Sequence, residues 1–172
     1  MFVVFDGYRP GALSGVLGLH MGYYAREWGF GLAFETKVAA ELAEFLARMD
    51  PERDLFLTAW RGGALAGSVS MDVTGGGPDG AHLRWFVVSD TARGSGLGKQ
   101  LMRRAIDHAD RVAAGPVWLT TFAGLEAARV LYERHGFVLS AQSEDDQWQG
   151  GVREQLFTRP APIGGQTESP QA

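Results

Sequence analysis

Residues 83–99 read LRWFVVSDTARGSGLGK, and this stretch decides how the rest of the chain is interpreted. Leu83 to Val88 is a run of apolar and β-branched residues, which predicts a strand. Leu97 to Ala113 places its apolar side chains at helical spacing, which predicts a helix. The glycine-rich loop from Arg93 to Lys99 therefore leads from a strand into a helix start, where free backbone N–H groups and the helix dipole favour an anion. We interpret this loop as a cradle for phosphate.

Spacing excludes two common nucleotide-binding loops. A P-loop needs a glycine five positions before the Gly98-Lys99 pair, where Arg93 stands, and a Ser or Thr in place of Gln100. The dinucleotide fingerprint G-x-G-x-x-G also fails, because the glycines stand at positions 94, 96 and 98. The remaining alternative is a merely flexible loop, and the strand and helix that flank it disfavour that alternative.

Five elements and one glycine-rich loop are expected before this stretch. They are a strand at Phe2 to Phe5, an aromatic-rich broken helix within Gly11 to Gly31, a helix from Glu35 to Met49, a hairpin of two strands at Leu55 to Trp60 and Leu65 to Asp72, and a flexible connection from Gly75 to Gly80. The helix is stopped by Asp50-Pro51, because a residue before proline disfavours helical backbone. The hairpin turns at Arg61 to Ala64, which contains two glycines.

Four further elements are expected after it. They are a strand at Val117 to Phe122, a helix from Glu126 to His135 closed by Gly136, and two last strands at Phe137 to Ser140 and Val152 to Thr158. Together these elements predict one α/β domain over residues 1–159, of the α+β kind. Its mixed, mostly antiparallel sheet would have six or seven strands flanked by about four helices. Residues 160–172 are rich in proline and glycine, which predicts a disordered C-terminal tail.

Composition limits the function classes. A chain of 172 residues with 45% hydrophobic residues has the size of one domain, and no segment reaches the roughly 20 apolar residues that span a bilayer. The formal charge of -4, with acids and bases interspersed, gives no basic surface for nucleic acid. The chain has no cysteine, which excludes disulfides, thiolate metal sites and a cysteine nucleophile. With no signal peptide pattern at Met1 to Pro10, we expect a cytoplasmic protein without membrane partners.

The loop and its flanks resemble the GNAT acetyltransferase superfamily. Its pattern (Arg or Gln)-x-x-Gly-x-(Gly or Ala) is met by Arg93, Gly96 and Gly98. The preceding strand Phe86 to Asp90 and the following segment Leu131 to Phe137 stand at the separations that the family shows. The resemblance covers most of the chain from Met1 to Thr158 and is firm from Ala81 to Phe137. The chain also resembles the acetyltransferase half of proteins that join this domain to a MarR-type winged helix.

The resemblance implies acetyl-CoA as cofactor and transfer of its acetyl group to a primary amine of a small molecule or protein. The cofactor-binding residues would be Phe86, Val87, Val88, Arg93, Gly94, Ser95, Gly96, Leu97, Gly98 and Lys99. A backbone N–H near Val87 or Val88 would polarise the thioester carbonyl, and the amine would attack directly. Tyr132 stands where a tyrosine of this family protonates the departing thiolate; its alternative is an aromatic side chain that only packs.

The sequence departs from the family pattern at two points. Leu125 stands where many relatives have an asparagine that contacts the CoA arm, and Arg84-Trp85 supplies no carboxylate before Phe86. These departures leave open a CoA-binding sensor or partner module without turnover.

The general base is therefore open among Glu35, Asp72 and His20, and a base acting through water needs no single residue. The expected acceptor pocket comprises His20, Tyr24, Trp28 and Asp72, with further aromatic and acidic candidates at Tyr23, Phe30, Phe34, Asp145, Asp146 and Trp148. No metal site is expected. The oligomeric state is left open, with a homodimer as one alternative.

Overall fold

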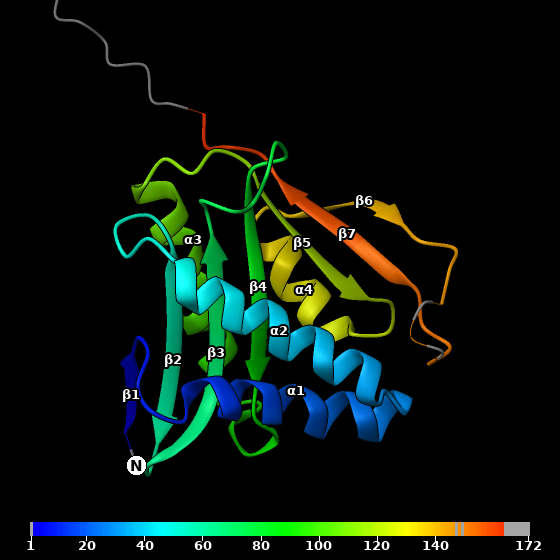
Figure 1. The fold of residues 1–172 in the computed structure, drawn as a ribbon. Helices are drawn as coiled ribbons and strands as arrows, with labels where there is room; N and C mark the ends of the chain where they lie inside the picture. The colour runs from blue at the N-terminus through cyan, green and yellow to red at the C-terminus, as the bar shows by residue number, and fades with distance from the viewer. Residues whose placement is uncertain (1, 147, 149, 164–172) are drawn as a thin grey trace, which may run out of the picture.

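The computed structural model describes residues 2–146, 148 and 150–163, and most of the predicted tail at 160–172 lies outside this range (Figure 1). Its strands form one sheet in the order β1-β2-β3-β4-β5-β7-β6, in which only the pair β4 and β5 is parallel. The elements in chain order are β1 (Val3–Asp6), α1 (Ala12–Trp28), α2 (Leu32–Arg48), β2 (Leu55–Arg61), β3 (Ala64–Asp72), β4 (Ala81–Val88), η1 (Asp90–Ala92), α3 (Leu97–Arg111), β5 (Val117–Phe122), α4 (Glu126–Arg134), β6 (Val138–Gln142) and β7 (Glu154–Arg159). The predicted fold class, a mostly antiparallel sheet with four α-helices, is confirmed.

Two hydrophobic cores lie on opposite faces of the sheet. Helices α1 and α2 cover one face and α3 and α4 the other (Figure 1). The core under α3 and α4 contains Leu101, Leu119 and Phe157, all almost fully buried. The core under α1 and α2 is richer in aromatic residues and contains Phe45 and Trp85. None of the described helices is both long enough and apolar enough to cross a membrane.

The first helix differs from its prediction. The sequence indicated a broken helix, whereas α1 runs without interruption from Ala12 to Trp28. Glycine weakens a helix in isolation, but tertiary packing overrides that preference here. A Cβ at Gly15 would come within 3.0 Å of the Leu65 side chain, so the glycine lets α1 lie close to the sheet. Gly29 ends the helix in the left-handed conformation, and its N–H donates to Ala25 O at 3.0 Å. Helix α2 begins at Leu32, three residues earlier than predicted.

Strand β4 carries a bulge that separates it from β5. Its register with β3 shifts so that Trp85 and Phe86 together oppose one β3 residue, and Trp85 has a φ of 48°. The Ser68 hydroxyl donates to the Trp85 carbonyl at 2.9 Å, and the Trp85 ring packs 5.4 Å from Phe45. These contacts hold a backbone conformation that is costly for a large side chain. Strand β5 pairs with β4 only at Ala81 and His82, so the two strands diverge beyond that point.

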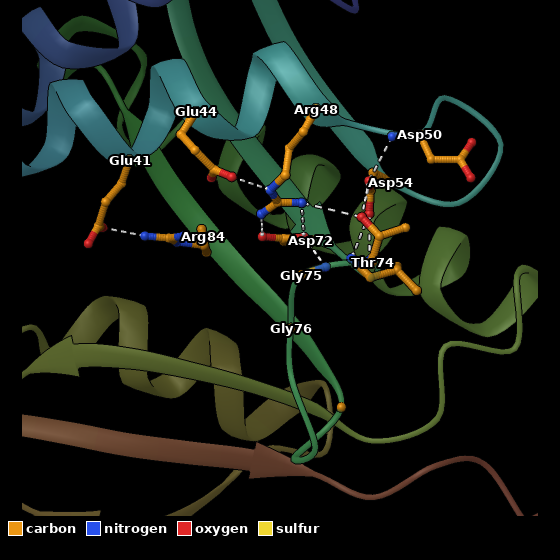
Figure 2. Close-up of polar contacts among 12 residues, drawn as sticks. Glu41, Glu44, Arg48, Asp50, Asp54, Asp72, Thr74, Gly75, Gly76 and Arg84 are labelled. Carbon is orange, nitrogen blue, oxygen red and sulfur yellow. Dashed lines mark hydrogen bonds and ion pairs between the residues drawn. The ribbon is translucent and has the colours of Figure 1, made fainter.

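A buried ion pair fixes the other end of this region. Arg48 of α2 donates to both oxygens of Asp72, at 3.1 and 2.5 Å, and the Gly75 N–H donates to Asp72 at 2.8 Å (Figure 2). Asp72 is 1% exposed, so it is almost completely removed from water. The loop after it has no regular structure, as predicted, but its glycines serve close packing. A Cβ at Gly76 would collide with the Gly80 carbonyl.

Replacing Asp72 by Asn is expected to lower the free energy of unfolding by about 2 kcal/mol. Breaking a buried pair costs about 3–5 kcal/mol when a charge is left uncompensated, but Arg48 keeps Glu44 and is one-third exposed, which reduces the loss. Urea denaturation measures this change. The matched control is Glu44→Gln, which removes the exposed partner of the same arginine and should cost less than about 0.5 kcal/mol. Equal effects of the two variants would contradict the buried ion pair as a source of stability.

Candidate active site

The predicted phosphate loop lies at the start of α3. Gly96 precedes the helix with a φ of 82°, and the first helical bond runs from the Gln100 N–H to Gly96 O at 3.2 Å. Among the described residues, the N–H groups of Leu97, Gly98 and Lys99 have no backbone acceptor, as expected for a first helical turn. A Cβ at Gly96 would meet nothing within 4 Å, so the loop is open on this side. The geometry provides backbone donors for an anion at a helix N-terminus.

The loop lies against the diverging strands. Arg93 and Tyr23 bring the loop and α1 together, with the guanidinium 4.6 Å from the ring centroid. On the other side, a Cβ at Gly98 would contact Phe86 and Val88 of β4 at 3.5 and 3.6 Å. Residues Phe86 to Val88 belong to the part of β4 that has no β5 partner. The start of α3 and the unpaired part of β4 are therefore in contact through Gly98, Phe86 and Val88.

Tyr132 lies in the core beside the unpaired part of β4. Its ring is 6.2 Å from Phe86 and 5.8 Å from Phe157, and only 5% of the residue is exposed. Burial raises the pKa of Tyr132 to about 12, and a hydrogen bond with the Thr121 side chain opposes part of that shift. The hydroxyl therefore holds its proton through the neutral range. A protonated hydroxyl at this position has the chemistry of a general acid.

A cavity of about 170 Å³ continues from Tyr132 between the helices and the sheet. Its apolar wall is aromatic, with Tyr24 of α1 and Phe34 of α2 at 5.2 Å between ring centroids, and Phe122 at 5.6 Å from Tyr24. Trp148 completes this wall. The predicted aromatic segment is thus gathered at one site. Trp28 and Phe30 both pack against Tyr24 and Phe122 without lining the cavity.

The predicted polar candidates fall in different places. His20 lines the cavity, whereas Asp72 is bound by Arg48 and does not line it. The register partner of Asp72 is His82, so Asp72 lies at the end of β4 that still pairs with β5. Glu35 is exposed on the first turn of α2 and does not line the cavity. Asp146 accepts hydrogen bonds from the N–H groups of Gly150 and Gly151 in the loop before β7. Asp145 belongs to the same loop. Leu125 precedes α4 and packs on the core of the α1 and α2 face.

His20 is held as a neutral imidazole. It is buried, its pKa is lowered by that burial, and its Nδ1 lies 2.8 Å from Val16 O. A carbonyl can only accept, so Nδ1 carries the proton and Nε2 keeps a lone pair. His20 therefore has an unprotonated Nε2 at neutral pH, and burial disfavours its charged form.

Sequence reasoning missed the charged side of the cavity. Lys37 and Glu41 of α2, His82 and Arg84 of β4, and Glu154 of β7 all line it. A signal was present for Glu41, because it shares the helical face of Phe34, Val38 and Phe45 at spacings of three and four. Among the described residues no group of three His, Asp or Glu side chains forms a metal site.

His82 is expected to make the protein sensitive to acid. Burial lowers the pKa of His82 to about 3, with a smaller repulsion from Arg84, and its ring stacks on Trp118 at 3.5 Å. In the unfolded chain histidine titrates near 6.5, so the unfolded state takes up the proton first as the pH falls. The stabilisation is complete above about pH 6.5 and is lost progressively toward pH 3, with about 2 kcal/mol lost by pH 5.

Urea denaturation at pH 7.5 and pH 5 measures this loss. Between the two pH values, the free energy of unfolding of His82→Gln should fall by about 2 kcal/mol less than that of the parent protein, because glutamine does not titrate. His135→Gln, at the end of α4, is the control and should keep the parent's dependence. An unchanged pH dependence in His82→Gln would contradict the assignment.

Comparison with known protein families identifies one family. The model described as "Acetyltransferase (GNAT) family" matches residues 13–137. No curated protein matches the sequence closely enough to count as a relative. The family assignment therefore rests on the match to the family model, and the solved structures show which folds are similar.

Three solved structures illustrate the likeness of fold. The ribosomal-protein-S18-alanine N-acetyltransferase from Escherichia coli is 20% identical, with 98% of this chain and 99% of that chain covered and a TM-score of 0.69. An acetyltransferase of the GNAT family from Staphylococcus aureus Mu50 is 13% identical, with 92% and 99% covered and a TM-score of 0.74. The yncA protein of Salmonella typhimurium, with its cofactor acetyl-CoA, is 15% identical, with 100% and 99% covered and a TM-score of 0.70. The match over residues 13–137 spans more than half of the sequence, and the chain belongs to the acetyltransferase (GNAT) family.

Proposed function

We propose that the protein is an N-acetyltransferase that moves the acetyl group of acetyl-CoA to a primary amine of a small molecule or protein. The observation that carries this proposal is that three features lie together around the unpaired part of β4. These are the open helix start at Gly96, the divergence of β4 and β5, and the protonated Tyr132. The family membership supports acyl transfer, and the yncA structure contains acetyl-CoA.

The residues of the loop fit the cofactor. The N–H groups of Leu97, Gly98 and Lys99, with the charge of Arg93, would hold the pyrophosphate. The unpaired edge of β4 at Phe86 to Val88 would bind the pantetheine arm through its backbone. When bound there, acetyl-CoA supplies a thioester whose acyl carbon accepts a nucleophile.

The chain's own residues would then move two protons. Tyr132 would give the proton of its hydroxyl to the leaving sulfur, and the pKa near 12 keeps that proton available. His20 is the candidate base that lines the cavity, through Nε2 directly or through water. Glu35 is exposed and Asp72 is ion-paired, so we assign neither of them a step in the chemistry.

A sensor that binds acetyl-CoA without turnover is the second candidate, and Leu125 favours it because it cannot supply the side-chain contact of an asparagine. One experiment separates the two functions. Calorimetric titration with acetyl-CoA is followed by thiol release against a panel of amines. Binding with release supports the enzyme, binding without release for any amine supports the sensor, and no binding would overturn both.

A further inference from the structure

One part of the cavity lining places two cations around one carboxylate. The Glu41 carboxylate lies between two cations, accepting from Lys37 Nζ at 2.6 Å through one oxygen and from Arg84 through the other (Figure 2 shows the Arg84 contact). All three residues line the cavity. One carboxylate of α2 thus contacts both cations, and Glu154 of β7 is the second carboxylate of the lining.

Arg84 has donors left for a ligand. A guanidinium carries five N–H groups, and among the described residues only Glu41 accepts one of them. The guanidinium lies over the Trp85 ring at 4.2 Å, and the side chain is 18% exposed. Burial lowers the pKa of Arg84, which shows that the cation is partly removed from water. A partly desolvated cation with unused donors is stabilised by an anion that binds in its plane.

The aromatic part of the cavity lining suits an apolar group. Tyr24, Phe34, Phe122 and Trp148 present rings there, and Glu154 is the acidic residue on β7. The volume of about 170 Å³ lies below the range of about 300–1,000 Å³ that drug-sized ligands occupy. A small acceptor with one apolar part and one anionic part matches these walls.

We propose that the acceptor is a free α-amino acid with an apolar side chain, whose carboxylate is bound by Arg84 and whose side chain packs on the aromatic wall. Arg84 precedes Phe86 by two residues across the bulge at Trp85, so the residue that would bind the anion adjoins the unpaired part of β4. In an α-amino acid one carbon separates the amine from the carboxylate, so an acid held by Arg84 would keep its amine close to the bound carboxylate. The amine nitrogen forms the amide bond as the thioester C–S bond breaks. One proton leaves the nitrogen and one joins the sulfur, giving an N-acetyl amino acid and free CoA.

The inference rests on the proposed function, and matched acceptors test it separately. L-Phenylalanine, L-leucine and L-methionine are each compared with their amides and with the amines that lack the carboxyl group, such as 2-phenylethylamine. We expect kcat/KM to favour at least one free acid over both of its matched compounds by about 10-fold or more, because a charge-assisted hydrogen bond contributes about that factor. Equal use of acid and amide, or a preference for the amide, would overturn the proposal.

Variants show whether Arg84 causes the preference. Arg84→Gln should remove the preference for the acid, whereas Arg103→Gln, which changes an exposed arginine of α3, should keep it. Calorimetry of the free amino acid with protein saturated by CoA gives a second readout without turnover, and Arg84→Gln should weaken that binding about 10-fold. A retained preference in Arg84→Gln would remove the arginine from acceptor recognition. If acetyl-CoA binds but no amino acid is acetylated, the acceptor class is wrong and the proposed function stands.

Discussion

Gly96→Glu is expected to weaken acetyl-CoA binding by about 100-fold or more. The new carboxylate would lie beside the N–H groups of Leu97 and Gly98, where a phosphate is proposed to bind. It would compete for the same donors and repel the ligand's negative charge. Losing or opposing one to two charge-assisted hydrogen bonds at about 1.5–3 kcal/mol each corresponds to this factor. Calorimetric titration with acetyl-CoA measures the affinity.

The control for this variant must separate charge from backbone strain. Gly96 has a φ of 82° and Gly115, in the turn between α3 and β5, has a φ of 79°; a Cβ at either position meets nothing within 4 Å. Gly115→Glu therefore carries the same strain and the same charge away from the loop, and should bind acetyl-CoA as the parent does. Gly96→Ala adds strain without charge and should bind better than Gly96→Glu. Parent-like affinity in Gly96→Glu would refute the phosphate site at this helix start.

The sequence could predict the parts of the site that are local in the chain. The loop from Arg93 to Lys99 needs only a strand before it and a helix after it, and both are visible as apolar patterns. The hairpin of β2 and β3 is equally local, because its turn carries Gly62 and Gly63 between two β-branched and aromatic runs. For such elements the neighbours that decide the structure lie within a few residues.

The features that the sequence could not predict depend on contacts between residues far apart in the chain. Arg84 pairs with Glu41, which lies 43 residues earlier, and Arg48 pairs with Asp72, which lies 24 residues later. No local pattern in the sequence indicates these pairs. The sequence therefore leaves Asp72 among the candidate bases, although Arg48 binds its carboxylate. The continuity of α1 is a similar case, because the side chain of Leu65 on β3 takes the space that Gly15 leaves open. The bulge at Trp85 is also non-local, since Ser68 and Phe45 hold it in place.

Tyr132→Phe is expected to lower kcat by about 100-fold or more while the affinity for acetyl-CoA stays within about 2-fold. General acid catalysis contributes factors of about 10²–10⁴, and the phenyl ring keeps the packing against Phe86 and Phe157. The stability cost should be about 1 kcal/mol, because only the hydrogen bond with Thr121 is lost. Steady-state thiol release and calorimetric titration measure the two quantities on the same preparation.

Turnover of Tyr132→Phe distinguishes an acid from a packing residue, and the pH profile of the parent tests whether the hydroxyl keeps its proton. Because the pKa of Tyr132 is about 12, the parent should show no loss of kcat from this group between pH 7 and pH 10, and any falling limb should begin above that range. Tyr8→Phe, which removes the hydroxyl of an exposed tyrosine, should keep both the rate and the profile. A residue that only packs predicts a different result, in which Tyr132→Phe keeps the parent's kcat because the ring is unchanged. Unchanged turnover would therefore remove the hydroxyl from the reaction, and the leaving sulfur would then take its proton from water.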